Sequence, residues 1–325
     1  MFIKYDNEAV SLTGRWYKTE NAAVTSTCGS KIEFSFYGKM AVMHFNMEYN
    51  EHPYPHLWIQ TDGGVRTEAA VDRYLRIYAE DDGPHNVSVI YKSGMEMQQR
   101  WYDPLVGKIA FMGFDAEKPG ELKSNNKRYI EFIGDSITEG CQVDFGYNIS
   151  SDFWPLNAPF QNDVTATYAY ITAAALNLEP LIMGYGGVGL TKSGCSSVPR
   201  AGLSYEYCCD GHPSELPEPD YIVINHGAND VYSDKEEYLS RYKEFLEQVS
   251  KKHPGAQIFV LGAFCGWCHE ELADLVDEYN MNRDSNVVYI NTYGWIPAEP
   301  LHPGRDGHKI VAEKLTKFLS PYVKE

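Results

Sequence analysis

The stretch YIEFIGDSITEGCQ, residues 129–142, decides the fold of this chain. Apolar residues alternate along its first half, which predicts a buried strand, and the chain then turns through Gly134, Asp135 and Ser136. Asp and Ser are both good helix N-caps, so the turn alone is consistent with an ordinary strand-to-helix connection. The same turn can also hold a serine nucleophile where helix N–H groups face an oxyanion. The other parts of the chain have to separate these two interpretations.

The composition is that of a globular protein with room for two domains. The chain has 325 residues, of which 43% are hydrophobic and 22% charged, and this length exceeds the usual size of one core. The formal net charge is −17 and the pI is about 5.0. The sequence lacks the basic clusters that a nucleic acid or an anionic membrane surface needs, and no apolar run approaches the ~20 residues that span a bilayer. We therefore expect no nucleic acid and no membrane as partner, and a neutral substrate.

The cysteines bear on compartment and cofactors. Seven cysteines, an odd number, occur in a chain whose N-terminus shows no leader pattern, so we expect reduced thiols and a cytoplasmic protein. Cys265-Gly-Trp-Cys268-His269 matches the CxxCH haem pattern, but haem attachment needs export and a haem-wrapping fold. Structural cysteines are the preferred interpretation, with a redox or metal role together with Cys208 and Cys209 as the alternative. Because HExxH, paired CxxC and acidic calcium-loop motifs are absent from the sequence, we predict no cofactor and no metal.

Hydrophobic periodicity divides the chain into two predicted domains. Residues 1–120 contain short alternating segments separated by Asp-Gly and Gly-Pro turns, which predicts an antiparallel sandwich. Residues 115–127 are polar and contain Pro and Gly, as linkers do. Strands then alternate with helix-like runs at 166–178 and 235–252, which is typical of a parallel sheet covered on both faces. The second predicted domain therefore spans 121–325.

Four loops that follow predicted strands, or precede the last helix, carry the candidate chemistry. Ligands of parallel sheets bind beyond the carboxyl ends of the strands. These loops hold Ser136, the glycine-rich segment 184–190, Asn229, and Glu299 with His302. Ester hydrolysis needs a nucleophile, a base and donors for the developing oxyanion. Ser136 as nucleophile, His302 as base, and Asn229 with backbone N–H groups as donors would supply all three.

The order and spacing of these blocks resemble a known superfamily. GDSITEG at 134–140, the glycine-rich loop, GAND at 227–230 and ExxHP at 299–303 are similar to the four blocks of the SGNH (GDSL) hydrolases, and the resemblance covers residues 129–320. TGRWYKTENAAVTSTCGSKIEFSFYGKM, residues 13–40, resembles the start of the jelly-roll domain in carbohydrate esterase family two. The resemblance implies an α/β fold, a three-layer parallel-sheet SGNH hydrolase domain preceded by an all-β jelly-roll sandwich domain. It also implies a serine esterase that removes O-acetyl groups from acetylated carbohydrate of the xylan or mannan type.

The resemblance implies a role for individual residues. It makes Ser136 the nucleophile and His302 the general base. It places the backbone N–H of Ser136, the N–H of Gly187 and the side-chain amide of Asn229 in the oxyanion hole. Gly189 is the alternative to Gly187, because the loop contains two glycines that fit the pattern.

One position departs from the family pattern. The superfamily usually has Asp three residues before the catalytic histidine, where this chain has Glu299. The longer side chain orients His302 Nδ1 only if the backbone is set back, and some family members are thought to use a backbone carbonyl instead. Glu299 as the orienting catalytic acid and Glu299 as an incidental loop residue both stay open.

Other residues near the blocks receive structural or binding roles. His308 is expected to pack or cap at the final helix, and His226 either lines the site or fills a loop. Asp135 and Asp230 are expected to hydrogen-bond to the local backbone. The candidates for contact with sugar are Trp154, Trp267 and Trp295.

Two other functions compete with a carbohydrate acetylesterase. SGNH folds host many acyl substrates, so a lipid, thioester or small-ester hydrolase is one alternative. A catalytically dead carbohydrate-binding protein is the other, and the complete Ser, Gly, Asn and His blocks argue against it. The expected partner is an acetylated oligosaccharide or another small ester, and the sequence predicts no oligomeric state.

Overall fold

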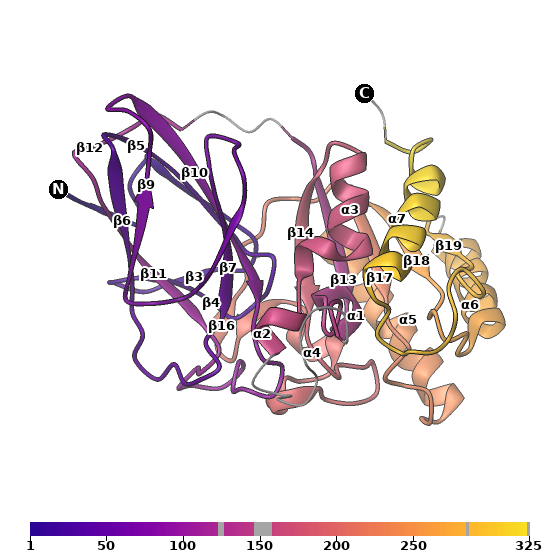
Figure 1. The fold of residues 1–325 in the computed structure, drawn as a ribbon. Helices are drawn as coiled ribbons and strands as arrows, with labels where there is room; N and C mark the ends of the chain where they lie inside the picture. Colours follow the sequence, from indigo (N-terminus) through magenta and orange to yellow (C-terminus); the bar gives the residue numbers. More distant parts are fainter. Residues whose placement is uncertain (123–126, 146–157, 284–285, 324–325) are drawn as a thin grey trace.

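The computed structural model describes most of the chain, namely residues 1–122, 127–145, 158–283 and 286–323. The strands of two antiparallel sheets lie within residues 2–119, and a parallel sheet begins at Tyr129. Figure 1 shows the two parts side by side, with the antiparallel sheets next to strand β14 of the parallel one. Part of the predicted linker, residues 123–126, lies outside the described residues.

The N-terminal part is a sandwich of two six-stranded antiparallel sheets. Phe34 from one sheet and Phe114 from the other are both fully buried, and their ring centroids lie 4.3 Å apart. Burial of such apolar side chains between the sheets is the main stabilising contribution here. In sheet order the first sheet contains β3 (Tyr17–Lys18), β4 (Ala23–Thr25), β11 (Ile109–Asp115), β6 (Met40–Phe45) and β9 (Tyr74–Tyr78), with β1 (Phe2–Lys4) beside β11. The second contains β12 (Lys118–Pro119), β5 (Lys31–Tyr37), β10 (Pro84–Ser93), β7 (His56–Thr61) and β8 (Thr67–Ala70), with β2 (Val10–Thr13) beside β5.

The C-terminal part is built on a five-stranded parallel sheet. Its strands are mostly apolar, as is typical of a parallel sheet that is covered on both faces. In the central strand, Ile222 and Ile224 belong to the buried cluster under one helical layer, whereas Val223 belongs to the cluster under the other. In sheet order the strands are β14 (Glu179–Gly184), β13 (Tyr129–Gly134), β17 (Tyr221–Asn225), β18 (Gln257–Leu261) and β19 (Val288–Ile290).

Among the described residues, four longer helices form the outer layers, as can be followed in Figure 1. The predicted helix at 166–178 is shorter in the structure, because Thr167 caps it by accepting a hydrogen bond from the Tyr170 N–H and a 3₁₀ turn precedes it. Within the described part of the chain, none of the helices combines the length and apolarity needed to cross a bilayer. One layer consists of α3 (Tyr168–Ala175) and α7 (Arg305–Leu319), and the other of α5 (Lys235–Lys252) and α6 (His269–Arg283). The short elements are α1 (Ser136–Glu139), α2 (Ala158–Gln161), η2 (Val164–Ala166), η3 (Cys195–Ser197), α4 (Ala201–Ser204), β15 (Tyr207–Cys209) and β16 (His212–Pro213).

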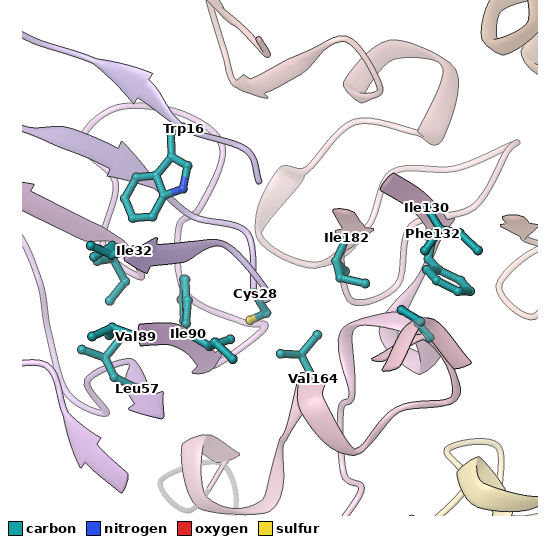
Figure 2. Close-up of a cluster of buried hydrophobic side chains, with 14 of the residues drawn as sticks. Trp16, Cys28, Ile32, Leu57, Val89, Ile90, Ile130, Phe132, Val164 and Ile182 are labelled. Atoms are coloured by element: carbon teal, nitrogen blue, oxygen red, sulfur yellow. The ribbon is translucent and has the colours of Figure 1, made fainter. Parts of the chain in front are cut away.

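The apolar core is continuous across the boundary between the two parts (Figure 2). Cys28, in the loop between β4 and β5, lies in the same buried cluster as Val164 and Ile182 of the C-terminal part. At Gly29 this loop packs so closely against β14 that a Cβ atom would lie 2.8 Å from Ile182 Cγ1. The sandwich therefore covers the edge strand β14, whose backbone an isolated α/β domain would leave exposed.

Candidate active site

Ser136 is presented by the turn between the buried strand β13 and the short helix α1. Asp135 caps this helix, with its Oδ1 accepting a hydrogen bond of 2.9 Å from the Ile137 N–H. Gly134 is required by close packing, because a Cβ atom there would lie 2.2 Å from Thr138 Oγ1. The N–H of Ser136 stands in the first turn of the helix, where backbone donors have no intrahelical acceptor. It can therefore donate to an oxyanion formed next to the Ser136 side chain.

The structure brings Ser136 and His302 together. The Ser136 Oγ–H donates to His302 Nε2 over 2.7 Å, although the residues are 166 positions apart. An Nε2 atom that accepts this bond requires the neutral ring to carry its proton on Nδ1. Burial lowers the pKa of His302 below its ordinary value, while the charge of Glu139 acts in the opposite direction. A lowered pKa keeps the ring neutral and able to accept the serine proton at neutral pH.

The group that faces His302 Nδ1 is an amide. Nδ1–H donates to Gln142 Oε1 over 3.1 Å. Gln142 has a left-handed backbone, with φ of 58°, and its N–H donates to Asn162 Oδ1 over 2.7 Å. Glu299, the predicted orienting acid, is exposed and makes no hydrogen bond with His302 in the structure. The structure thus supplies a neutral carbonyl oxygen at the position where the triad of serine hydrolases has a carboxylate.

The two candidate glycines of the second loop differ in what their N–H groups do. The Gly189 N–H donates to Lys192 O over 3.1 Å. The hydrogen bonds of the described residues include none from the Gly187 N–H. Gly187 has φ of +75°, a conformation that L side chains rarely adopt. These observations favour Gly187 over Gly189 as the oxyanion donor.

Asn229 is held next to the loop that carries Ser136. Its Nδ2 donates to Asp135 Oδ2 over 3.2 Å and to Val188 O over 3.1 Å. Both hydrogens of Nδ2 are used in these bonds, so the amide has to give up one of them in order to donate to an oxyanion. Burial raises the pKa of Asp135 to about 7, against the hydrogen bond from the Ile137 N–H. Through its two oxygens, Asp135 both caps helix α1 and holds the side-chain amide of Asn229.

Asp230 connects the second and third loops. Its carboxylate accepts hydrogen bonds from the N–H groups of Leu190 and Thr191 and from Thr191 Oγ1, over 3.1, 2.9 and 2.6 Å. A Cβ atom on Gly189 would lie 2.6 Å from Asp230 Oδ1. Gly189 thus makes room for this carboxylate. The carboxylate of Asp230 bonds to backbone groups 39 and 40 positions away, in contrast to the local backbone expected from the sequence.

The two remaining histidines near the blocks are buried in the helical layers. His308 accepts a hydrogen bond of 3.1 Å at Nδ1 from the Tyr168 N–H, and burial lowers its pKa to about 3. His226 packs edge to face against Phe245, with ring centroids 6.0 Å apart, and burial lowers its pKa to about 4. Both rings therefore stay neutral and pack against helices.

The predicted sugar-contacting tryptophans are only partly covered by the structure. Trp154 lies outside the described residues. Trp267 and Trp295 are half-buried, with the Nζ atoms of Lys235 and Lys314 at 5.8 and 5.7 Å from their ring centroids. All seven cysteines are free. Within the residues that the structure describes, no group of three or more His, Cys, Asp or Glu side chains is placed to hold a metal ion.

Sequence reasoning missed two residues that support the histidine side of the site. Gln142 stands at the end of the opening stretch, but no periodicity or motif indicates that its side chain reaches a histidine 160 positions away. Arg305 makes two hydrogen bonds to Asp144, over 2.5 and 2.7 Å, and fixes the start of α7 just after His302. The sequence gives no signal for this pair, because Arg305 and Asp144 are 161 positions apart.

The α/β domain holds a hydrogen-bonded serine–histidine pair beyond the carboxyl ends of its strands. This arrangement is typical of a serine hydrolase. The sequence model of the GDSL-like Lipase/Acylhydrolase family matches residues 132–310, and the chain belongs to this family. The predicted membership of the SGNH (GDSL) hydrolase superfamily is therefore confirmed.

Two characterised proteins and a solved structure are similar over more of the chain. Cellulase/esterase CelE of Acetivibrio thermocellus is 26% identical over 350 aligned positions, which cover 96% of this chain and 39% of CelE. Acetylxylan esterase / glucomannan deacetylase of Cellvibrio japonicus is 25% identical over 273 positions, 78% of this chain and 72% of that protein. A family two carbohydrate esterase from Clostridium thermocellum, solved in complex with cellohexaose, has a TM-score of 0.79 at 24% identity, covering 97% of this chain and 99% of that one. The predicted jelly-roll and SGNH architecture is confirmed, and this chain spans about two fifths of the length of CelE.

Proposed function

We propose that this protein is a serine esterase that removes O-acetyl groups from acetylated carbohydrate. The observation that carries the proposal is the 2.7 Å hydrogen bond between Ser136 Oγ and His302 Nε2. A hydroxyl that donates to a neutral imidazole is activated as a nucleophile. The Ser136 N–H, the Gly187 N–H and Asn229 Nδ2 lie on the adjoining loops and supply the donors.

The first half of the reaction forms an acetyl-enzyme. Ser136 Oγ attacks the acetyl carbonyl carbon while its proton passes to His302 Nε2. The carbonyl oxygen becomes an oxyanion that accepts hydrogen bonds from the Ser136 and Gly187 N–H groups and from Asn229 Nδ2. The imidazolium is stabilised by the carbonyl dipole of Gln142 at Nδ1. When the ester C–O bond breaks, Nε2 returns the proton to the departing sugar oxygen, which leaves as a hydroxyl group.

The second half hydrolyses the acetyl-enzyme. His302 Nε2 takes a proton from water, and the resulting hydroxide oxygen attacks the acetyl carbon. The same donors hold the second oxyanion. Cleavage of the bond to Ser136 Oγ then returns the proton from His302 to the serine and releases acetic acid, which loses its remaining proton to solvent and becomes acetate. No group beyond water is consumed.

The net charge of the chain and its relatives support the proposed class of substrate. A net charge of −17 disfavours anionic substrates and is compatible with a neutral acetylated sugar. The relatives' names include an acetylxylan esterase / glucomannan deacetylase, and the related family two esterase was solved with cellohexaose. The hydrolase fold itself accepts many acyl groups, so these relatives support the acetylated carbohydrate over a lipid ester.

The test is acetate release measured in parallel from acetylated xylan, acetylated glucomannan and a long-chain lipid ester. We expect release from at least one of the two polysaccharides or their oligosaccharides, and a rate at least tenfold lower on the lipid ester. The Ser136→Ala variant serves as the blank. Faster turnover of the lipid ester would replace the proposed substrate class, and equal rates for the variant and the wild type would remove the proposed mechanism.

We also propose a cytoplasmic location, supported by the odd number of cysteines. A protein in that compartment would act on imported oligosaccharides. Fractionation of the native organism checks this, and recovery of the protein from the culture medium would contradict it.

A further inference from the structure

Two buried arginines of the sandwich pair with glutamates of the hydrolase part. Arg15 Nη2 lies 2.8 Å from Glu131 Oε1, and both side chains are fully buried. Arg100, in the loop between β10 and β11, pairs with Glu139, and these side chains are 1% and 3% exposed. The pairs share chemistry and burial, but only the second one reaches a loop of the candidate active site.

Glu139 links Arg100 to the second loop. It belongs to the same GDSITEG block as Ser136, and its Oε2 accepts a hydrogen bond of 2.8 Å from the Gly186 N–H. Its other oxygen, Oε1, takes the hydrogen bond from Arg100 Nη1. The next residue after Gly186 is Gly187, whose N–H is the proposed oxyanion donor. The carboxylate therefore fixes the peptide group directly before that donor.

The opposite side of Gly186 is also fixed by neighbours. The Gly186 carbonyl oxygen accepts a hydrogen bond of 2.7 Å from the Cys195 N–H. A Cβ atom on Gly186 would lie 2.8 Å from Glu96 Cβ, so the sandwich loop is in direct contact with this glycine. The orientation of the Gly186–Gly187 peptide thus depends on contacts that include the sandwich.

The same sandwich loop also reaches the histidine side of the site. Gly94 O accepts a hydrogen bond of 3.0 Å from Asn162 Nδ2. Asn162 Oδ1 in turn accepts from the Gln142 N–H, and Gln142 Oε1 faces His302 Nδ1. One loop of the N-terminal part, residues 94–100, therefore supports both the oxyanion donor and the base.

We infer that Arg100 is a positioning residue of the hydrolase site. Through Glu139 it fixes the Gly186 peptide and with it the direction of the Gly187 N–H, so the sandwich completes the oxyanion hole. This inference rests on the proposed ester hydrolysis, in which Gly187 stabilises the transition state.

The positive charge of Arg100 balances the buried negative charge of Glu139. Removal of Arg100 leaves the buried carboxylate of Glu139 without a counter-charge. Glu96 lies close by, and burial together with the charge of Glu139 raises the pKa of Glu96. A buried carboxylate without its cation moves toward water or toward another donor, and this movement weakens its bond to the Gly186 N–H.

The test compares Arg100→Met with the matched variant Arg15→Met. Both break a buried ion pair between the two parts, so both are expected to lower the melting temperature. We expect Arg100→Met to lower kcat on an aryl acetate by about 10–100-fold with KM changed less than threefold, as for loss of a group that acts only in the transition state. Arg15→Met should keep kcat within threefold at a temperature where both variants are folded. An aryl trifluoromethyl ketone, which forms an oxyanion on the serine, should lose affinity for Arg100→Met by the same factor as kcat/KM falls.

Glu139→Gln keeps the experiment informative if Arg100→Met does not fold. It preserves the volume and an oxygen acceptor but removes the charge that binds Arg100, and kcat should fall about tenfold. Equal kcat losses in the Arg100 and Arg15 variants, or normal kcat in folded Arg100→Met or Glu139→Gln, would overturn the inference. The proposed function fails separately, through activity that survives in Ser136→Ala.

Discussion

The loops that carry Ser136 and His302 are held in opposite ways. Ser136 follows a buried strand and starts a helix whose four residues are all buried. His302 follows an exposed run, residues 297–301, and is itself only half-buried. Local backbone contacts fix the serine, whereas the histidine depends on side chains from distant segments.

This difference determines how substitutions should act. A change next to Ser136 alters a turn that Asp135 and Gly134 define through short-range contacts. A change next to His302 should act on the ring where the altered side chain touches it or, as with Arg305, anchors the adjoining helix. The contact at Nδ1 is with Gln142, while Glu299 is exposed to solvent. The serine loop should therefore be sensitive along its length, and the histidine loop only at particular contacts.

The largest expected effect is on the serine loop itself. Ser136→Ala removes the atom that we propose as the nucleophile, and we expect kcat on an aryl acetate to fall by about 10⁴-fold or more, as in other serine hydrolases. A serine-directed organophosphonate should add its mass to the peptide that contains Ser136 in the wild type and leave the variant unlabelled. Inactivation with the label on another peptide would assign the nucleophile elsewhere.

Asn229→Ala tests the third loop, which is tied to the serine loop through Asp135. We expect kcat to fall by roughly 10²–10³-fold with KM little changed, the size found for loss of one oxyanion donor. Steady-state kinetics on the aryl acetate measure both parameters. Near-normal kcat in a folded variant would show that another group donates to the oxyanion.

The same contrast explains what the sequence could predict. The strand, the turn and the cap around Ser136 are encoded within a few residues, so the α/β sheet followed from periodicity, and the resemblance of the four blocks made Ser136 the expected nucleophile. The partner of His302 Nδ1 is Gln142, which lies 160 positions away in the sequence. The family pattern had instead indicated Glu299, three residues before the histidine. Spacing gives no information on where an exposed loop directs a side chain. The same holds for Arg100, because the surface on which the two parts pack has no signature in either part alone.

Gln142→Ala and Glu299→Gln compare the two candidates for orienting the histidine. We expect Gln142→Ala to lower kcat by about 10–100-fold, because the ring loses the acceptor that holds the Nδ1 tautomer. The loss should be smaller than the ~10⁴-fold effect of a triad aspartate, since an amide supplies a dipole and no charge. Glu299→Gln should stay within threefold of wild type. The reverse ranking in kcat would return the orienting role to Glu299.

The smallest expected effect is a shift of the pH profile, and it separates a neutral partner from a charged one. His302 acts as a base only when neutral, so kcat/KM rises with pH through its pKa in the free enzyme. Burial lowers that pKa below its ordinary value of 6.5, which places the midpoint of the acidic limb below pH 6.5 in the wild type. Gln142→Glu puts a carboxylate at Nδ1, which favours the imidazolium and should move the midpoint upward by about one unit. Glu299→Gln is the matched control, and its midpoint should not move. If the midpoint is instead unchanged in Gln142→Glu and falls in Glu299→Gln, the charge that acts on the histidine comes from the exposed loop, and the contrast between the two loops is wrong.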